Sequence, residues 1–141
     1  MTPEMSQKIR CSILKHEGFT NYLYEDTVGK QTIGYGYNVT DRGIATKYLD
    51  AMYEDDVNFF YHQLLNFSWF HELNSDRQIV LIDMCFMGFK KFLSFKRMIN
   101  ALEKHDYKRA SEEMLDSKWA EQVKGRAAAL AMAMQTGVYL M

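Results

Sequence analysis

A chain of 141 residues, 48% of them hydrophobic, is long enough for one domain with a buried core and too short for two ordinary domains. Its net charge of −1 argues against a dedicated nucleic-acid-binding protein, because such proteins carry a strong basic excess. The apolar segment 127–141 is shorter than the ~20 residues of a membrane span, so we expect no stable membrane insertion.

The amino-terminal part is predicted to form a helix followed by a small sheet. Thr2-Pro3-Glu4 is a strong helix start, because threonine caps a helix, proline suits its first turn and an acid favours its positive end. Gly18 is placed to end this helix, so Glu17 lies at its last position. Residues 22–37 are rich in aromatic and β-branched types with a turn near Val28-Gly29-Lys30, which predicts a hairpin or small sheet.

The rest of the chain is predicted to be helical, because apolar residues recur at helical spacing. The predicted helices are Leu49–Leu64, one capped by Asn74 or Ser75 that carries Ile79, Ile82, Cys85, Phe86 and Phe89, then Phe95–Leu102, Tyr107–Leu115 and an alanine-rich helix from about Arg126 to Gln135. The fold class is therefore α+β, mostly helical, in a single domain over residues 1–141.

The charge distribution and the cysteines indicate which partners and which cellular compartment to expect. Residues 1–76 carry a net charge of −5 and residues 77–141 carry +4, which indicates two lobes, a cationic face for an anionic partner, or merely different solvated helix faces. Two buried reduced thiols, Cys11 and Cys85, are favoured over a disulfide. The histidines have no metal-ligand spacing, so we expect no metal and no cofactor. No secretory signal opens the chain, which favours accumulation in the cytoplasm.

Two carboxylates near the amino terminus are the candidate catalytic pair. Glu17 precedes Asp26 by nine positions, and Asp26 precedes Thr32 by six. Glycoside hydrolysis needs an acid to protonate the leaving oxygen and a second carboxylate that acts at the anomeric carbon, directly or through water. A hydroxyl such as that of Thr32 can position that water. By spacing alone, ordinary surface charges explain these residues as well.

The residues around this pair resemble the active-site region of phage-type lysozymes, glycoside hydrolase family 24. The likeness lies in Glu17-Gly18, Tyr24-Glu25-Asp26-Thr27, Gly29 and Thr32-Ile33-Gly34-Tyr35-Gly36, with weaker matches downstream at Arg77, Asp83–Gly88, Ser117–Trp119, Gln122, Arg126-Ala127, Thr136-Gly137 and Tyr139. The family pattern of Glu, eight residues, Asp or Cys, five residues and Thr is matched without a gap.

This resemblance implies a two-lobed lysozyme-like fold, with lobes at roughly 14–65 and 66–141 and the first helix packing near the carboxyl-terminal lobe. It implies that Glu17 is the general acid, that Asp26 is the base or electrostatic partner, and that Thr32 positions water in an inverting reaction. The expected substrate is the glycan strand of peptidoglycan, cut between N-acetylmuramic acid and N-acetylglucosamine by a monomer. The expected location is the host cytoplasm until a holin allows release to the periplasm or cell wall.

Several neighbouring residues carry two interpretations. Tyr24, Tyr35 and Tyr37 either bind substrate by stacking on sugar rings or pack within the hairpin. Tyr37 stands where the family commonly has His, and residues 37–77 form a shorter stretch than in the family. Trp119 is favoured as a core residue, and Arg126 as a donor within the carboxyl-terminal lobe.

Two rival functions stay open. A lytic transglycosylase cuts the same polymer without water and needs one acid, so Asp26 and Thr32 weigh against it. A catalytically silent muramidase domain could serve as a wall-binding or scaffolding module, and the intact Glu-Asp-Thr set weighs against that.

Overall fold

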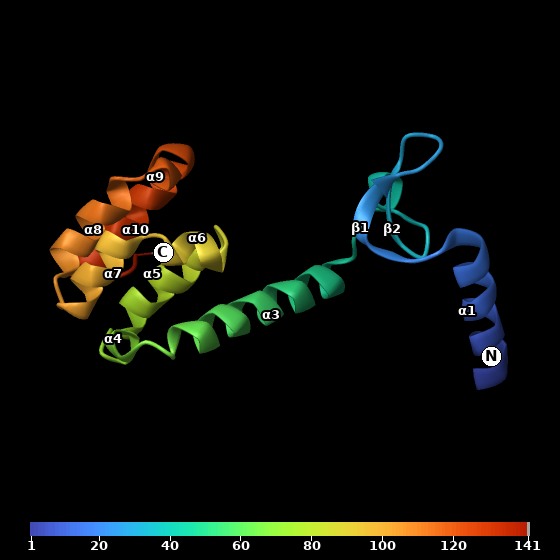
Figure 1. Ribbon diagram of the computed structural model, residues 1–141, viewed down its shortest axis with the longest axis horizontal. Helices are drawn as coiled ribbons and strands as arrows, with labels where there is room; N and C mark the ends of the chain where they lie inside the picture. Colours follow the sequence, from blue (N-terminus) through green and yellow to red (C-terminus); the bar gives the residue numbers. More distant parts are fainter. Residues whose placement is uncertain (141) are drawn as a thin grey trace. The chain divides into compact units, whose positions relative to one another are not determined.

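The computed structural model describes residues 1–140 and is mostly helical, with one three-stranded sheet near the amino terminus (Figure 1). This confirms the predicted α+β class. In chain order the elements are α1 (Pro3–Glu17), β1 (Thr20–Glu25), β2 (Gln31–Gly34), β3 (Tyr37–Asn38), α2 (Val39–Arg42), α3 (Thr46–Leu64), α4 (Ser68–His71), α5 (Ser75–Cys85), α6 (Phe89–Leu93), α7 (Lys96–Glu103), α8 (Tyr107–Leu115), α9 (Lys118–Val123) and α10 (Gly125–Thr136).

The chain divides into two compact units, and each is described by itself. The first unit is Met1–Met52 and the second begins at Tyr53. The lobe boundary near residue 65 and the packing of the first helix near the carboxyl-terminal lobe stay predictions.

Helix α1 begins and ends where its capping residues predict. The Thr2 hydroxyl accepts a hydrogen bond from the Met5 N–H at 3.1 Å, and Pro3 follows it as the first helical residue. Gly18 ends the helix at φ +73° and donates its N–H to the Leu14 carbonyl at 3.0 Å. A positive φ favours glycine over any residue with a Cβ. Glu17 is therefore the last residue of the helix, as predicted.

The sheet is antiparallel in the order β1-β2-β3, and β2 is its central strand. Thr32 pairs with Tyr24 on β1 and with Asn38 on β3. With a strand on each side, Thr32 is only 4% exposed. The predicted hairpin between residues 22 and 37 is thus confirmed, with a third strand added.

The second unit holds a helical core. Figure 1 shows α7, α8 and α10 side by side, with α5 next to α10. Their inward side chains are fully or almost fully buried, and they include Leu81, Met84, Met98, Leu102, Met114, Leu130 and Met134. Burying a side chain of this size removes apolar surface from water and stabilises the fold by roughly 1.5–3 kcal/mol each. Trp119 on α9 belongs to this core at 4% exposure, as expected.

The helix predicted through Phe89 is shorter than expected, and its buried face was partly misassigned. Asn74 caps α5 as predicted, but the helix ends at Cys85, and α6 begins at Phe89 after Gly88 adopts φ +108°. The buried residues of α5 are Val80, Leu81, Met84 and Cys85, whereas Ile79 is 46% exposed and Phe86 42%. The run Ile79-Val80-Leu81-Ile82 is apolar on every side, so spacing could not decide which face packs inward.

One further expectation was wrong. Cys85 is buried and free, but Cys11 is exposed and free, because α1 buries none of its side chains. The predicted pair of buried thiols is therefore reduced to one.

Candidate active site

Glu17 is positioned by the end of α1 and by a glycine of the sheet. Its side chain is exposed and lies against Gly36, where an added Cβ would stand 3.1 Å from the Glu17 Oε2 atom and 3.4 Å from its Cδ. Gly36 also has φ +84°. The backbone conformation therefore favours glycine at position 36, and a larger residue would also have to displace the end of the Glu17 side chain by a few tenths of an ångström.

Asp26 lies in the turn after β1, where main-chain donors fix one oxygen of its carboxylate. The Oδ1 atom accepts the N–H of Val28 at 2.9 Å and that of Lys30 at 2.8 Å. The turn itself is closed by the Asp26 N–H to the Lys30 carbonyl at 2.9 Å and the Gly29 N–H to the Asp26 carbonyl at 3.1 Å. The half-buried carboxylate thus has a defined orientation that does not depend on other side chains.

Thr32 is directed at the same turn. Its hydroxyl donates to the Lys30 carbonyl at 3.0 Å. A hydroxyl has one proton to donate, so the Thr32 oxygen can act toward a water molecule only as an acceptor. Asp26 and Thr32 are therefore held by the same residue, Lys30, through its N–H and its C=O.

Lys30 also connects the turn to α2 through its side chain. Its ammonium lies 3.0 Å from the Oδ1 of Asp41. Hydrogen bonds from Lys30 and, to a lesser extent, from Asn38 hold the pKa of the exposed Asp41 carboxyl below its usual range. The Lys30–Asp41 pair is exposed, so it orders the loop more than it stabilises the fold.

The three predicted tyrosines do not gather in one place. Tyr35 and Tyr37 both line a hollow of about 700 Å³ within Met1–Met52, beside Phe19, Arg42 and Tyr48 among others, and Tyr24 is not part of its lining. This hollow is of the size that small ligands occupy. Gly36 joins the two features, because it lines the hollow and contacts Glu17.

The tyrosine hydroxyls of the hollow already have partners. Tyr35 accepts a hydrogen bond from Arg10 at 2.8 Å, and Tyr37 donates to the Gly43 carbonyl at 2.7 Å. The Arg42 guanidinium covers one face of the Tyr37 ring, 4.2 Å from its centroid. Only the uncovered ring faces can stack on a sugar, so the packing interpretation holds for part of each side chain.

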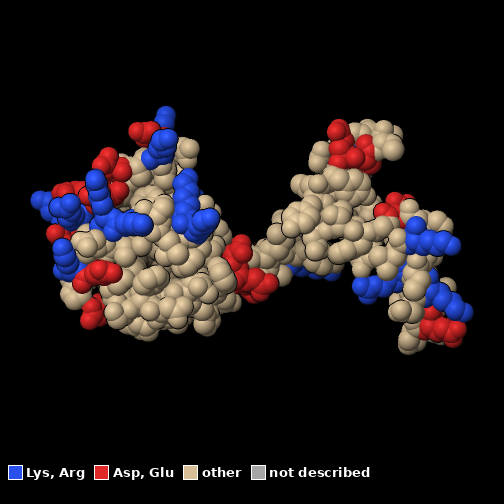
Figure 2. Space-filling view, in the orientation of Figure 1, with Lys and Arg blue, Asp and Glu red and all other residues tan. Residues whose placement is uncertain are grey.

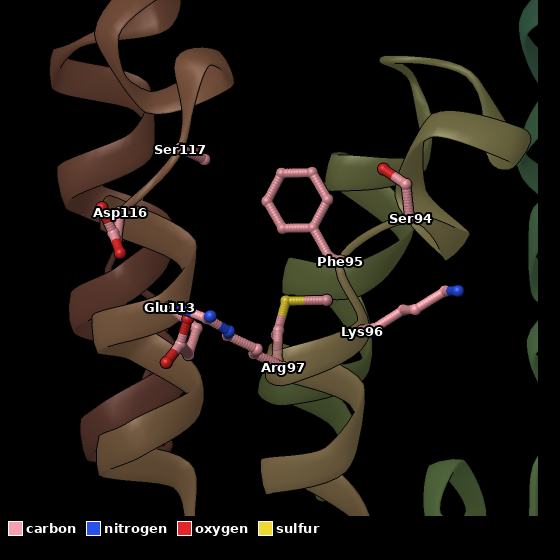
Figure 3. A pocket seen from close by; sticks show the side chains of 8 residues that line it. Ser94, Phe95, Lys96, Arg97, Glu113, Asp116 and Ser117 are labelled. Carbon is pink, nitrogen blue, oxygen red and sulfur yellow. The ribbon is translucent and has the colours of Figure 1, made fainter.

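The second unit contains a smaller hollow of about 340 Å³ between the start of α7 and the end of α8 (Figure 3). Its lining mixes charges, with Lys96 and Arg97 on one side and Glu113 and Asp116 on the other. Elsewhere in this unit Arg126 bonds to the Asp83 carboxylate through its Nε at 2.8 Å and through its Nη2, which confirms its predicted structural role.

Sequence reasoning missed Lys30 and Gly36 as positioning residues. Gly36 could have been found, because it belongs to the Gly-x-Gly segment after Thr32. Lys30 acts on Asp26 and Thr32 through main-chain atoms, which leave no signal in side-chain type. Residues 1–140 contain no group of three or more His, Cys, Asp or Glu placed to hold a metal ion. Within the same range, no helix is both long and apolar enough to cross a membrane.

Comparison with known proteins places this chain in a family. Residues 14–133, which include Glu17, Asp26 and Thr32, match the model of the phage lysozyme family, and the chain belongs to that family. It is similar to two proteins of Dictyostelium discoideum, probable T4-type lysozyme 2 at 25% identity and probable T4-type lysozyme 1 at 24%. Each match covers 94% of this chain and 96% of the relative.

Proposed function

We propose that this protein is a muramidase that hydrolyses the β-1,4 bond between N-acetylmuramic acid and N-acetylglucosamine in peptidoglycan. The observation that carries the proposal is the phage lysozyme match over residues 14–133, a range that contains Glu17, Asp26 and Thr32. The two similar proteins of Dictyostelium discoideum, both named probable T4-type lysozymes, support the same class.

In this proposal each residue has one task. Glu17 protonates the leaving glycosidic oxygen, which demands a carboxylic acid within reach of the substrate. Asp26 accepts the proton of a water molecule through the carboxylate oxygen that the turn does not use. Thr32 accepts a hydrogen bond from that water, since its own proton is donated to Lys30. Tyr35 and Tyr37 contribute ring faces to sugar binding.

The setting we infer is a bacteriolytic endolysin. The enzyme accumulates in the host cytoplasm as a monomer until a holin gives access to the periplasm or cell wall. Destruction of the wall would make it antimicrobial when applied from outside to permeabilised cells.

The test of the proposal is loss of turbidity of permeabilised bacterial cells. Glu17→Gln is expected to lower the rate by roughly 10²–10⁴-fold, because an amide cannot protonate the leaving oxygen. Glu4→Gln, on the same helix and exposed, is the matched control and should keep the wild-type rate. Near-native lysis by a folded Glu17→Gln variant would remove Glu17 from the mechanism.

Product analysis separates the rival reactions in the same assay. A water held by Asp26 and Thr32 attacks directly, so the new reducing end should have inverted configuration, read by proton NMR before mutarotation. A 1,6-anhydro product would establish a lytic transglycosylase. Binding of wall fragments with no product at all would establish the silent scaffolding domain.

A further inference from the structure

The second unit presents a run of basic residues without acidic neighbours in sequence. Residues 84–102 contain no Asp or Glu and four basic residues, Lys90, Lys91, Lys96 and Arg97. All four side chains are exposed, and none forms an ion pair within residues 53–140. Within the second unit their charges therefore have no acidic partner.

The helices that carry these residues are anchored in the core. Phe92 on α6 and Met98 on α7 are both fully buried. The Lys91 carbonyl accepts the Ser94 N–H at 3.1 Å and the Ser94 hydroxyl at 2.5 Å, which fixes the link between the two helices. The ammonium groups are thus presented from a rigid surface, so binding through them costs little backbone entropy.

Two acids, Glu113 and Asp116, line the same hollow as Lys96 and Arg97. Figure 3 shows Arg97 extending toward Glu113, while the Lys96 side chain extends away from α8. Glu113 is also 3.6 Å from Arg109. Lys96 and Arg97 both line the mixed-charge hollow, but only Arg97 extends toward an acid there. We therefore separate Arg97 from Lys90, Lys91 and Lys96, which we call the lysine surface. Figure 2 shows the basic groups of this unit spread over the upper half of its visible face, with acidic groups among those at its left and top.

An exposed aromatic ring contacts the residue that precedes the lysine surface in the sequence. Phe89, the residue before Lys90, packs edge-on against Phe59 with ring centroids 6.2 Å apart. Phe59 is 52% exposed, and no acidic residue occurs between positions 57 and 71. Lysines beside an exposed aromatic side chain suit the interface of an anionic membrane, where the charges meet headgroups and the ring enters the apolar boundary.

We propose that the lysine surface, together with Phe59, binds the headgroup layer of an anionic lipid bilayer peripherally. Nothing in this interaction requires a helix to enter the bilayer. A polymeric anion such as a wall phosphate polymer would use the lysines but leave Phe59 without a role, and the experiment distinguishes the two. None of these residues belongs to the proposed catalytic set, so this inference and the proposed function can fail separately.

The test is co-sedimentation of the full chain with phosphatidylcholine vesicles, with and without phosphatidylglycerol. Binding is expected only with the anionic lipid, and it should weaken as salt rises. Lys90→Gln combined with Lys91→Gln should reduce the apparent affinity by about 30-fold, because each lysine near such a surface contributes about 1 kcal/mol. Lys104→Gln combined with Lys108→Gln is the matched control, since both are exposed and lie outside residues 84–102.

Phe59→Ser is the variant that distinguishes a lipid bilayer from a soluble polymeric anion as the partner. It should weaken vesicle binding without changing the steepness of the salt dependence, because it removes apolar contact and no charge. Equal losses of vesicle affinity in the Lys90/Lys91 and Lys104/Lys108 double variants would show a diffuse charge effect and overturn the proposal. Binding that is unaffected by Phe59→Ser, with equal binding to a soluble polyphosphate, would assign the surface to polymeric anions instead. Wild-type binding to neither vesicle would also overturn it.

Discussion

One oxygen of the Asp26 carboxylate is hydrogen-bonded within its own turn, and the other is not. The structural role of Asp26 and its proposed catalytic role can therefore be tested separately. Oδ1 accepts two main-chain N–H groups, while no hydrogen bond within residues 1–140 involves Oδ2. An asparagine keeps one oxygen that can hold the turn, but its amide cannot accept the proton of water. The catalytic contribution can therefore be removed while the local structure is kept.

We expect Asp26→Asn to lower lytic activity by roughly 10²-fold or more while melting at the wild-type temperature. Glu25→Gln, at the neighbouring exposed position, is the matched control and should lyse normally. Asp26→Cys should retain measurable activity, since the family pattern tolerates Cys there, although sulfur is a poorer acceptor for the turn N–H groups. Turbidity assays and thermal melting measure both effects. Wild-type lysis by Asp26→Asn would make Asp26 a bystander, whatever the result for Glu17.

Among the elements, those whose ends are set by local residues could be predicted, and those set by packing could not. Thr2, Pro3 and Gly18 fix α1 through their own backbone and capping preferences, so both ends were correct. The division of the predicted Phe89-containing helix into α5 and α6 depends on how Met84, Cys85 and Phe92 fit the core, which one sequence does not show. Helices α2, α4 and α6 have only four or five residues, too few for an apolar period to appear.

The same distinction applies to the candidate site. Glu17, Asp26 and Thr32 could be proposed from the sequence because the proposed reaction depends on the type of their side chains, and their spacing resembles a family pattern. Lys30 was missed because it acts on Asp26 and Thr32 through its peptide groups, a role that any residue type except proline can fill in that conformation. Gly36 is an intermediate case between these two, because what matters at position 36 is the absence of a side chain.

The end of α10 depends on one arginine from α5. The Arg77 Nε donates to the Met134 carbonyl at 2.7 Å and its Nη2 to the Gln135 carbonyl at 3.0 Å. These carbonyls belong to the last turn of α10, where intrahelical donors are absent. The guanidinium lies 3.9 Å from the Tyr107 ring centroid, and an added Cβ at Gly137 would stand 3.1 Å from its Cζ.

Arg77→Ala is therefore expected to lower the free energy of unfolding by about 2–3 kcal/mol, through loss of charge-assisted hydrogen bonds and the cation–π contact. Arg77→Lys should restore only part of this, because an ammonium cannot reproduce the planar fork of donors. Lys108→Ala, exposed on α8, is the control and should stay within about 0.5 kcal/mol of the wild type. Urea denaturation provides the values. A change of similar size in Lys108→Ala would mean that Arg77 has no special role.

At the scale of the whole molecule, the hydrophobic core and the candidate catalytic residues lie in different units. Within Met1–Met52, Thr32 is the only buried side chain, whereas the hydrophobic core lies from Phe60 to Met134. The unit with the candidate catalytic residues thus has few buried contacts of its own. Regions of this kind open at low free-energy cost, and functional loops are commonly drawn from them.

Cys85 offers a direct probe of the core of the second unit. Its side chain is fully buried on α5, and burial raises the pKa of its thiol from the ordinary 9.0 to about 12. Only the thiolate reacts with disulfide reagents, so both access and ionisation protect Cys85 in the folded state. In a Cys11→Ser background, where Cys85 is the only thiol, mildly alkaline buffer should give no labelling of the native protein.

Unfolding in denaturant should then expose that thiol and give complete labelling. Substitutions that destabilise the core, Arg77→Ala first among them, should speed the native-state reaction in proportion to the population of open molecules, provided that reclosing is faster than labelling. Lys108→Ala should leave the rate unchanged. Rapid labelling of Cys85 in the undisturbed native protein would contradict its burial, and with it the packing of α5 against α10 described above.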